Sequence, residues 1–176
     1  MYTEIKIFDL FIKMLSNAQQ VKQFTEGSQC QCPDTPIPMN KQEVKFVIHM
    51  VVSEMVELAQ TVCDTDTEAI QMVQVGATTD VSKYTRTTDQ DEITADQADA
   101  AVDAMYYLYN CFAKKGVNLS KVFDVVHKAN MAKRDPTTGK FIKRESDGKV
   151  LKPAGWLAPN IKNEILNQKT TGSWNI

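Results

Sequence analysis

Two acidic residues three positions apart stand in a run of otherwise largely apolar residues, VVSEMVELAQ. They are Glu54 and Glu57. On a helix they lie about 60° apart, because each residue turns the helix by roughly 100°. The same side carries four apolar side chains, Phe46, Val47, Met50 and Leu58. A charge in such a setting is costly unless something compensates it, so both carboxylates are predicted to face inward at least in part.

A second acidic row lies in ADQADAAVDAMYYLYN, where Asp96, Asp99 and Asp103 share one helix side. Alanines on the other sides would let a second helix approach closely. Five facing carboxylates cannot all stay ionised unaided, and hard oxygen ligands without cysteine or histidine suit Mg²⁺ or Mn²⁺. The two rows therefore predict a divalent metal site. The alternative for either row is a solvated helix face.

The charge of the chain is divided between its two parts. Positions 1–113 hold 7 basic and 17 acidic residues, and positions 114–176 hold 13 basic and 5 acidic residues. The basic side chains from the end of one predicted helix onward are Lys128, Lys133, Arg134, Lys140, Lys143, Arg144, Lys149 and Lys152. Such donors can hold phosphate oxygens, although a solvated surface is the alternative. A metal site combined with basic groups suits a polyphosphate substrate.

Helical periodicity dominates the chain and predicts an all-α fold, a helical bundle with a small C-terminal β-hairpin. Helices are predicted at about 3–15, 17–25, 41–63, 94–115 and 120–134, with a last helical turn near 161–167 and one weak helical segment in the polar stretch 64–93. The hairpin is predicted around Asp147-Gly148. One domain is predicted over 1–176, with a helical extension at 1–16 and a tail at 166–176. The first helix is apolar nearly all round, which predicts burial in the core or between subunits.

Several classes of protein are disfavoured by the sequence. No apolar run approaches the roughly 20 residues of a membrane span, and charges interrupt the N-terminal apolar run, so neither a span nor a signal peptide is predicted. Four scattered cysteines favour free thiols in a reducing cytoplasm. The two histidines form no His-Asp pair, and the chain has no Glu-x-x-His and no Gly-rich phosphate loop.

The motifs resemble those of the all-α nucleoside triphosphate pyrophosphohydrolase superfamily, which includes MazG-like and dimeric dUTPase-like enzymes. Its Glu-x-x-Glu and Glu-x-x-Asp pairs correspond to EMVE (Glu54, Glu57) and DQAD (Asp96, Asp99). The later segment is similar to the phosphoribosyl-ATP pyrophosphohydrolase-like branch. Its matching positions are Asp103, Asn130, Lys133, Gly148, Lys149, Lys152 and Pro153. The resemblance covers about 20–160.

The resemblance implies hydrolysis of a nucleotide between its α and β phosphates, giving a nucleoside monophosphate and pyrophosphate. Mg²⁺, or Mn²⁺, would be held by Glu54, Glu57, Asp96, Asp99 and Asp103. Glu54 or Glu57 would take the proton from the attacking water. The phosphates or the leaving pyrophosphate would be bound by Asn130, Lys133, Arg134, Lys149 and Lys152. Family members also imply a homodimer or tetramer.

Alternatives stay open at this stage. The substrate is a nucleotide, but phosphoribosyl-ATP and housekeeping substrates such as dUTP or damaged nucleotides fit the same chemistry. A non-catalytic module that binds metal or nucleotide is the second class. Nucleic acid is disfavoured as a partner, since the acidic part would repel its backbone. Trp156 or Tyr107 could contact the base or sugar, although packing roles are favoured for both.

Overall fold

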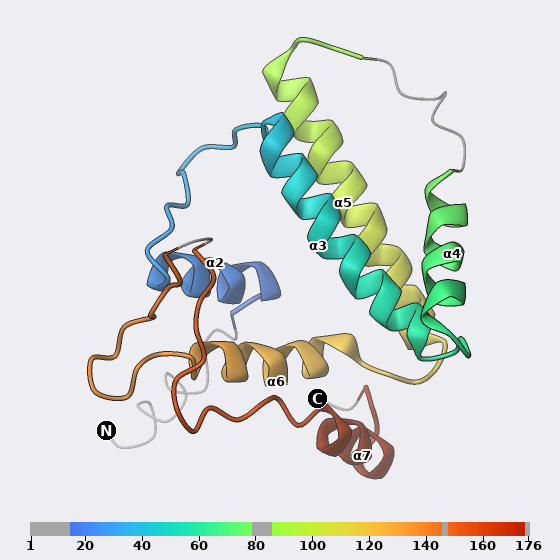
Figure 1. The fold of residues 1–176 in the computed structure, drawn as a ribbon, viewed down its shortest axis with the longest axis vertical. Coiled ribbons are helices and arrows are strands. Elements are labelled where there is room, and N and C mark those ends of the chain that lie inside the picture. The colour runs from blue at the N-terminus through green and yellow to red at the C-terminus, as the bar shows by residue number, and fades with distance from the viewer. Residues whose placement is uncertain (1–14, 79–85, 146–147, 175–176) are drawn as a thin grey trace, which may run out of the picture. The chain divides into compact units, whose positions relative to one another are not determined.

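The computed structural model describes residues 15–78, 86–145 and 148–174 (Figure 1). These residues form six helices and no regular strand. The helices are α2 (Asn17–Gly27), α3 (Lys41–Gln60), α4 (Asp66–Ala77), α5 (Gln90–Ala113), α6 (Leu119–Met131) and α7 (Ile161–Thr171). The prediction of an all-α fold is confirmed.

Side-chain caps explain where most helices begin. Ser16 forms a capping box with Gln19 at the start of α2, and Asn40 forms one with Glu43 at the start of α3. Asn118 accepts hydrogen bonds from the first backbone amides of α6. Such caps satisfy donors that a helix start leaves without partners. These three helices therefore begin within two residues of the predicted positions.

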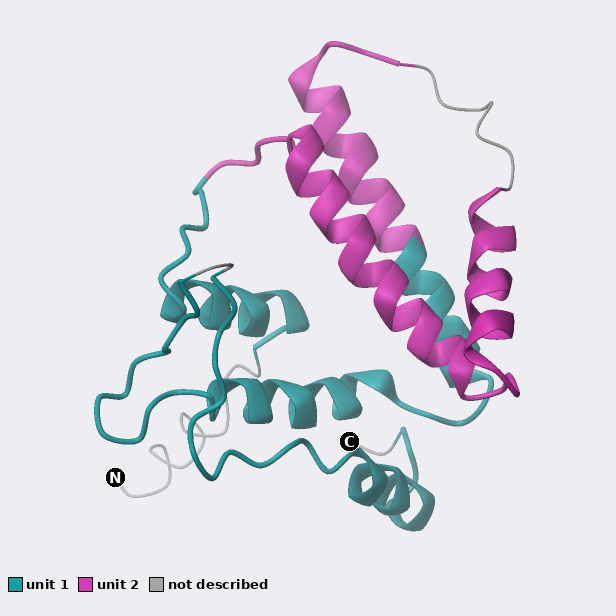
Figure 2. Cartoon of the chain, viewed as in Figure 1, with its two compact units in different colours: residues 1–34, 104–176 teal, residues 35–103 magenta. Residues whose placement is uncertain are grey.

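The chain divides into two compact units (Figure 2). Unit 1 comprises residues 1–34 and 104–176, and unit 2 comprises residues 35–103. Helix α5 contributes to both, because the division falls between Asp103 and Ala104. The single domain over 1–176 stays a prediction.

Unit 2 is held together by the packing of α3 on α4. Ala59 and Ala69 are buried, and the small side chain of alanine lets two helix backbones approach closely. Gln60 Nε2 donates to Asp66 Oδ1 at 2.8 Å across the turn between the two helices. Gln97 of α5 binds both backbone groups of Met39, with its Oε1 2.7 Å from the amide nitrogen. This pair of bonds ties the start of α3 to α5.

Unit 1 is built around α6, which packs on α2 and on α7. Gln20 Nε2 donates to Asp124 Oδ1 at 2.8 Å between α2 and α6. The side chain of Gln168, a buried residue of α7, binds both backbone groups of Asn118. Phe141 is also buried, with its ring edge-on to Phe24 at a centroid distance of 5.1 Å. The core of unit 1 therefore joins segments more than a hundred residues apart.

The predicted β-hairpin is reduced to isolated antiparallel bridges, Arg134 with Phe141 and Lys143 with Val150. Leu151 N donates to Ile142 O at 2.8 Å, so the chain does reverse here. The prediction of regular strands is wrong for the described residues. Two short strands without a third strand to extend them are marginal in water. Isolated backbone hydrogen bonds and the buried ring of Phe141 hold this segment.

Two other predictions differ in outcome. The weak segment within 64–93 is a regular twelve-residue helix, α4, capped by Thr65. The N-terminal helix predicted at about 3–15 lies outside the described residues, apart from Leu15. None of the described helices is long and apolar enough to cross a membrane.

Candidate active site

The first acidic pair lies in the second half of α3. Glu54 and Glu57 are both exposed, and neither makes a hydrogen bond or an ion pair with a described residue. Their apolar neighbours Phe46, Met50 and Leu58 are exposed as well, by 65%, 44% and 42%. The pair therefore does stand in an apolar setting, but in this chain that setting faces outward.

The second acidic row lies on the part of α5 that belongs to unit 2. Asp96, Asp99 and Asp103 are exposed and also without a hydrogen-bonding or ionic partner among the described residues. No Cα of α3 comes within 8 Å of a Cα of α5 in this unit. In the part of the chain that the structure describes, no three side chains of His, Cys, Asp or Glu gather as a metal site would require.

The donor chemistry of the two rows nevertheless suits a divalent metal. All five side chains are carboxylates, and none is neutralised by a lysine or arginine of the described residues. Hard oxygen donors of this kind are the ligands that Mg²⁺ and Mn²⁺ prefer. The five carboxylates are therefore available as metal ligands, but the two rows do not come together within this single chain.

The predicted phosphate-binding residues of unit 1 are organised differently. Lys133 Nζ donates to Asn130 Oδ1 at 2.7 Å, one turn back along the chain. The same ammonium lies 5.5 Å from the centroid of the Trp156 ring, and Lys152 Nζ lies 4.5 Å from it. Three of the five predicted residues, Asn130, Lys133 and Lys152, thus lie together beside the ring of Trp156, which was not among the five.

The charges of this cluster repel one another. Burial lowers the pKa of Lys133, and the positive charges of Lys152 and then Lys149 lower it further. Neither Lys133 nor Lys152 forms an ion pair with a described carboxylate. An anion held between the ammonium groups would relieve this repulsion, because opposite charge within a few ångströms favours the charged form of lysine.

Trp156 is the residue of this cluster whose role the sequence left open. Its Nε1 donates to Ala129 O at 2.7 Å, near the end of α6, and its side chain is half-buried. The bond fixes the ring beside the two ammonium groups. No local sequence signal indicates this contact, because it joins positions 27 residues apart through an irregular segment.

Two other predicted contacts come out differently. Arg134 lies with its guanidinium 5.1 Å from the centroid of Phe141, so it stacks on the core of unit 1. Tyr107 is 70% exposed and lines none of the pockets described here. A phosphate role for Arg134 and a base contact for Tyr107 both stay predictions.

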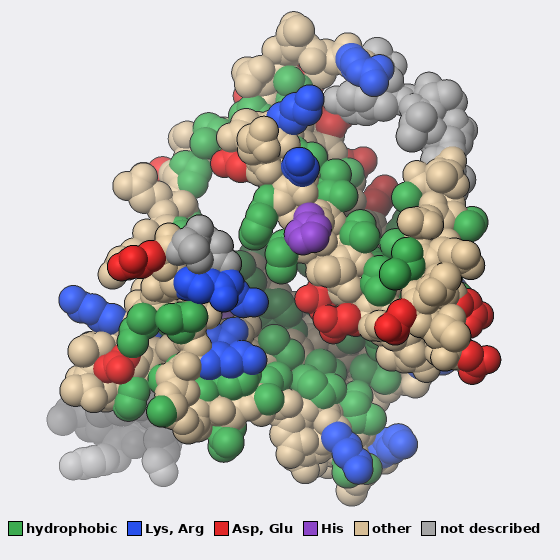
Figure 3. All heavy atoms as spheres, viewed as in Figure 1, with side chains coloured by type: hydrophobic (Ala, Val, Ile, Leu, Met, Phe, Trp, Pro, Cys, Tyr) green, Lys and Arg blue, Asp and Glu red, His purple; other side chains and the backbone are tan. Residues whose placement is uncertain are grey.

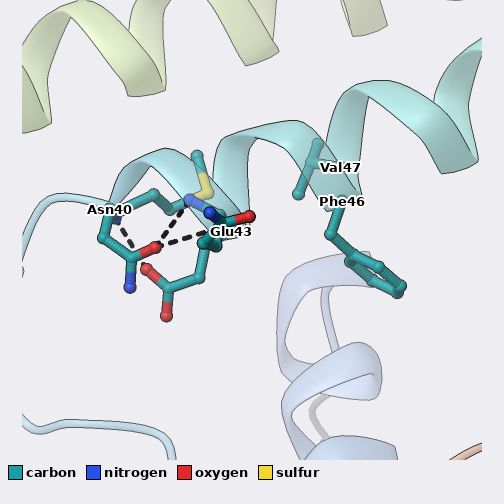
Figure 4. Close-up of a pocket in the computed structure, with 6 residues that line it drawn as sticks. Asn40, Glu43, Phe46 and Val47 are labelled. Carbon is teal, nitrogen blue, oxygen red and sulfur yellow. Dashed lines mark hydrogen bonds between the residues drawn. The ribbon is translucent and has the colours of Figure 1, made fainter. Parts of the chain in front are cut away.

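Three pockets open on the described surface. One of about 480 Å³ lies at the start of α3, where Phe46 and Val47 follow the capping box of Asn40 and Glu43 (Figure 4). The second, of about 350 Å³, is lined by residues of α2 and α6 that include His127. The third, of about 430 Å³, is an almost wholly apolar hollow of unit 1 around Leu108 and Phe123. None of the three is lined by a predicted acidic residue.

The surface of both units carries exposed apolar side chains. On the face drawn in Figure 3, hydrophobic side chains lie open over both units, and a group of basic side chains lies over the irregular segment of unit 1. Exposed large apolar residues on α3 include Phe46, Ile48 and Val51. Large exposed apolar patches are typical of interaction sites in soluble proteins.

Comparison with solved structures finds a similar architecture. The chain resembles the crystal structure of a candidate NTP pyrophosphohydrolase from Exiguobacterium sp. 255-15, with a TM-score of 0.79 and 32% identity. The match covers 90% of this chain and 99% of that one. No protein of curated function matches the chain. The fold is that of the all-α, MazG-like pyrophosphohydrolases.

The family within this class follows from the sequence. Residues 21–130 match the phosphoribosyl-ATP pyrophosphohydrolase family, PRA-PH, over more than half of the chain. The chain belongs to this family, and it is a pyrophosphohydrolase. The matched range contains both acidic rows and ends at Asn130. The predicted resemblance and enzyme class are thereby confirmed.

Proposed function

We propose that this enzyme is a Mg²⁺-dependent nucleoside triphosphate pyrophosphohydrolase. It cleaves between the α and β phosphates and releases a nucleoside monophosphate and pyrophosphate. The observation that carries the proposal is the family match over residues 21–130, which spans every predicted metal ligand. The similarity to a candidate NTP pyrophosphohydrolase along 90% of the chain supports the triphosphate as substrate.

Each group of residues has a part in this reaction. Glu54, Glu57, Asp96, Asp99 and Asp103 would hold the metal. Bound Mg²⁺ supplies charge neutralisation at the phosphates and eases ionisation of a water molecule. Glu54 or Glu57 accepts the proton from the attacking water as it bonds to phosphorus. The ammonium groups of Lys133 and Lys152 stabilise charge on the leaving pyrophosphate, beside Asn130, Arg134 and Lys149.

The assembly proposed here is a homodimer or tetramer in which a second copy covers the apolar surface of unit 2. Among the described residues of this unit, Ala59 and Ala69 are the buried apolar side chains. Phe46, Val47 and Met50, on the same side of α3 as Glu54 and Glu57, remain 65%, 42% and 44% exposed. Facing the same helices of another copy would bury these side chains and bring further carboxylates near each acidic row.

Light scattering tests this assembly. Met50→Asp places a charge in the apolar surface and should lower the solution mass toward that of one 19.8 kDa chain. Lys45→Asp, on the same helix, is the matched control and should leave the mass unchanged. A wild-type protein of monomeric mass would contradict the proposed assembly.

Phosphoribosyl-ATP is the second candidate substrate, because the description of the matching family names it. It offers the same triphosphate chain, so the metal and basic groups would act on it alike. The four cysteines, all free thiols, agree with action in a reducing cytoplasm.

The first experiment incubates the protein with a panel of nucleoside triphosphates, phosphoribosyl-ATP and Mg²⁺, and measures pyrophosphate against orthophosphate. Pyrophosphate should form from at least one of them, and should vanish without metal and in Glu57→Gln. Release of orthophosphate alone would overturn cleavage between the α and β phosphates. No product from any nucleotide, with the protein folded and metal bound, would favour a non-catalytic binding module.

A further inference from the structure

Trp156 stands at the centre of the basic cluster and is not one of the residues to which the family motifs point. Its indole is anchored at one end, by the bond from Nε1 to Ala129 O of 2.7 Å. Its ring faces two ammonium groups, with Lys152 Nζ at 4.5 Å and Lys133 Nζ at 5.5 Å from the centroid. One aromatic ring therefore serves two cations that would otherwise repel each other.

The physical reason for such an arrangement lies in the charge distribution of the indole. The face of an aromatic ring is electronegative, and tryptophan attracts cations most strongly of the aromatic residues. The attraction is stronger where the cation is partly removed from water, as Lys133 is. It offsets part of the repulsion that lowers the pKa of Lys133. The ring thus permits two ammonium groups to remain close together before any anion arrives.

The cluster is also restrained at its other points. Lys133 Nζ is held by Asn130 Oδ1 at 2.7 Å, and both residues are partly buried. Lys152 comes from the segment after the chain reversal, where Leu151 N donates to Ile142 O at 2.8 Å. Two lysines from different segments are therefore held at one ring. A flexible lysine pair would lose side-chain entropy on binding an anion, and restraint beforehand reduces that cost.

We propose that Trp156 is a positioning residue that holds Lys133 and Lys152 as a preformed site for pyrophosphate. The site binds pyrophosphate, and the corresponding part of a nucleotide, without help from the divalent metal. This inference rests on the proposed function for its biological substrate, but the binding step can be measured without any hydrolysis. Trp156 acts through the two lysines and does not itself contact the reacting atoms.

The chain offers a direct optical test, since its only other tryptophan, Trp174, is 59% exposed and remote in sequence. In the Trp174→Phe protein, all tryptophan emission comes from Trp156. Titration with inorganic pyrophosphate in the presence of a chelator should change that emission saturably. Lys152→Met in the same background should weaken binding about tenfold or more, since a hydrogen bond between two charged groups is lost.

Two substitutions separate positioning from packing, with pyrophosphate affinity measured by calorimetry. Trp156→Leu removes the ring and should raise the dissociation constant about tenfold. Trp156→Phe keeps an aromatic face without the Nε1 bond, and should recover at least half of the lost binding free energy. In steady-state kinetics KM should rise several-fold in Trp156→Leu, and kcat should fall as well, because the two lysines also stabilise charge on the leaving pyrophosphate. Unfolding curves of each variant verify that the protein measured is folded.

The possible outcomes distinguish failure of this inference from failure of the proposed function. Unchanged pyrophosphate affinity in folded Trp156→Leu would overturn the inference, as would Trp156→Phe behaving no better than the leucine variant. If Trp156→Leu does not fold, equal affinity in wild type and Lys152→Met overturns it instead. Metal-free pyrophosphate binding that depends on Trp156, without hydrolysis of any nucleotide, would sustain the inference and refute the proposed function. Hydrolysis with Trp156-independent binding would do the reverse.

Discussion

The acidic rows of unit 2 and the basic cluster of unit 1 are prepared to different degrees. Lys133 and Lys152 are already held beside Trp156 by contacts within unit 1. The five predicted metal ligands on α3 and α5 have no partner among the described residues and form no metal-binding group there. Opposite charges within one chain could have paired, yet these groups have not. Three of the five predicted phosphate-binding residues thus lie together within one chain, whereas the predicted metal ligands await a cation and, we propose, another copy.

The largest expected effect is on the acidic side. Glu57→Gln removes one charge and one proton acceptor and keeps the size of the side chain. General-base catalysis contributes about 10²–10⁴-fold to a rate, so kcat should fall by at least about a hundredfold. Pyrophosphate release from the best nucleotide measures it.

The matched control is Glu43→Gln on the same helix. Glu43 accepts a hydrogen bond from Asn40 N at 2.7 Å in the capping box, and glutamine can accept it equally well. This variant should keep kcat within about twofold, since it makes the same change of charge outside the site. Equal losses in both variants would mean that the overall charge of α3, and not Glu57, matters.

The next largest effect tests whether the acidic rows and the basic cluster bind their ligands independently. Asp99→Asn should weaken Mn²⁺ binding, measured by calorimetry, by about tenfold or more, because a carboxylate ligand is lost. The same variant should bind metal-free pyrophosphate as the wild type does. Weakened pyrophosphate binding in Asp99→Asn would show that the acidic and basic sites are not independent.

A smaller effect concerns pH. The pKa of Lys133 is lowered, first by burial and then by Lys152 and Lys149, so this ammonium loses its proton at a lower pH than an ordinary lysine. Anion binding needs the protonated form, so metal-free affinity for pyrophosphate should fall as pH rises through that lowered pKa. Calorimetric titrations from neutral to alkaline pH measure the fall. In Lys133→Met the fall should begin at higher pH, and an unchanged profile would exclude Lys133 as its source.

Much of this comparison was predictable from residues alone. The spacing of Glu54, Glu57, Asp96 and Asp99 placed the carboxylates on two helices, because helical geometry fixes which residues share a side. The outward orientation of α3 could not be predicted in this way. An apolar side of a helix indicates that something covers it, and does not reveal whether that is the same chain or another.

Two local features differed in how far the sequence could predict them. Helix α4 carried a usable signal, since Thr65 and Glu68 have the spacing of a capping box, but the polar composition of the stretch hid it. The position of Trp156 carried none. Its ring meets Lys133 only because the chain reverses between them, and the reversal is held by scattered bridges instead of a patterned strand pair.

The smallest expected effect compares the packing of the two units through one kind of substitution. A Cβ added at Gly27 would lie 3.0 Å from Phe141 Cε2 and 3.0 Å from Arg134 Nη2. The arginine can move, but the buried ring cannot without disturbing Phe24. Overpacking costs about 1–3 kcal/mol and outweighs the helix propensity gained, so Gly27→Ala should lower the free energy of unfolding by about 1 kcal/mol.

Gly76→Ala is the counterpart in unit 2. Nothing lies within 4 Å of a Cβ at Gly76, near the end of α4, so the added methyl meets no neighbour. Alanine leaves the unfolded chain fewer conformations than glycine does, and it also favours the helix. Gly76→Ala should therefore raise the free energy of unfolding by about 0.4–1 kcal/mol. Chemical denaturation of both variants should therefore move the midpoint in opposite directions. Stabilisation by Gly27→Ala would show that α2 packs more loosely on Phe141 than these distances indicate. Unit 1 could then not be described as the more rigidly preformed of the two units.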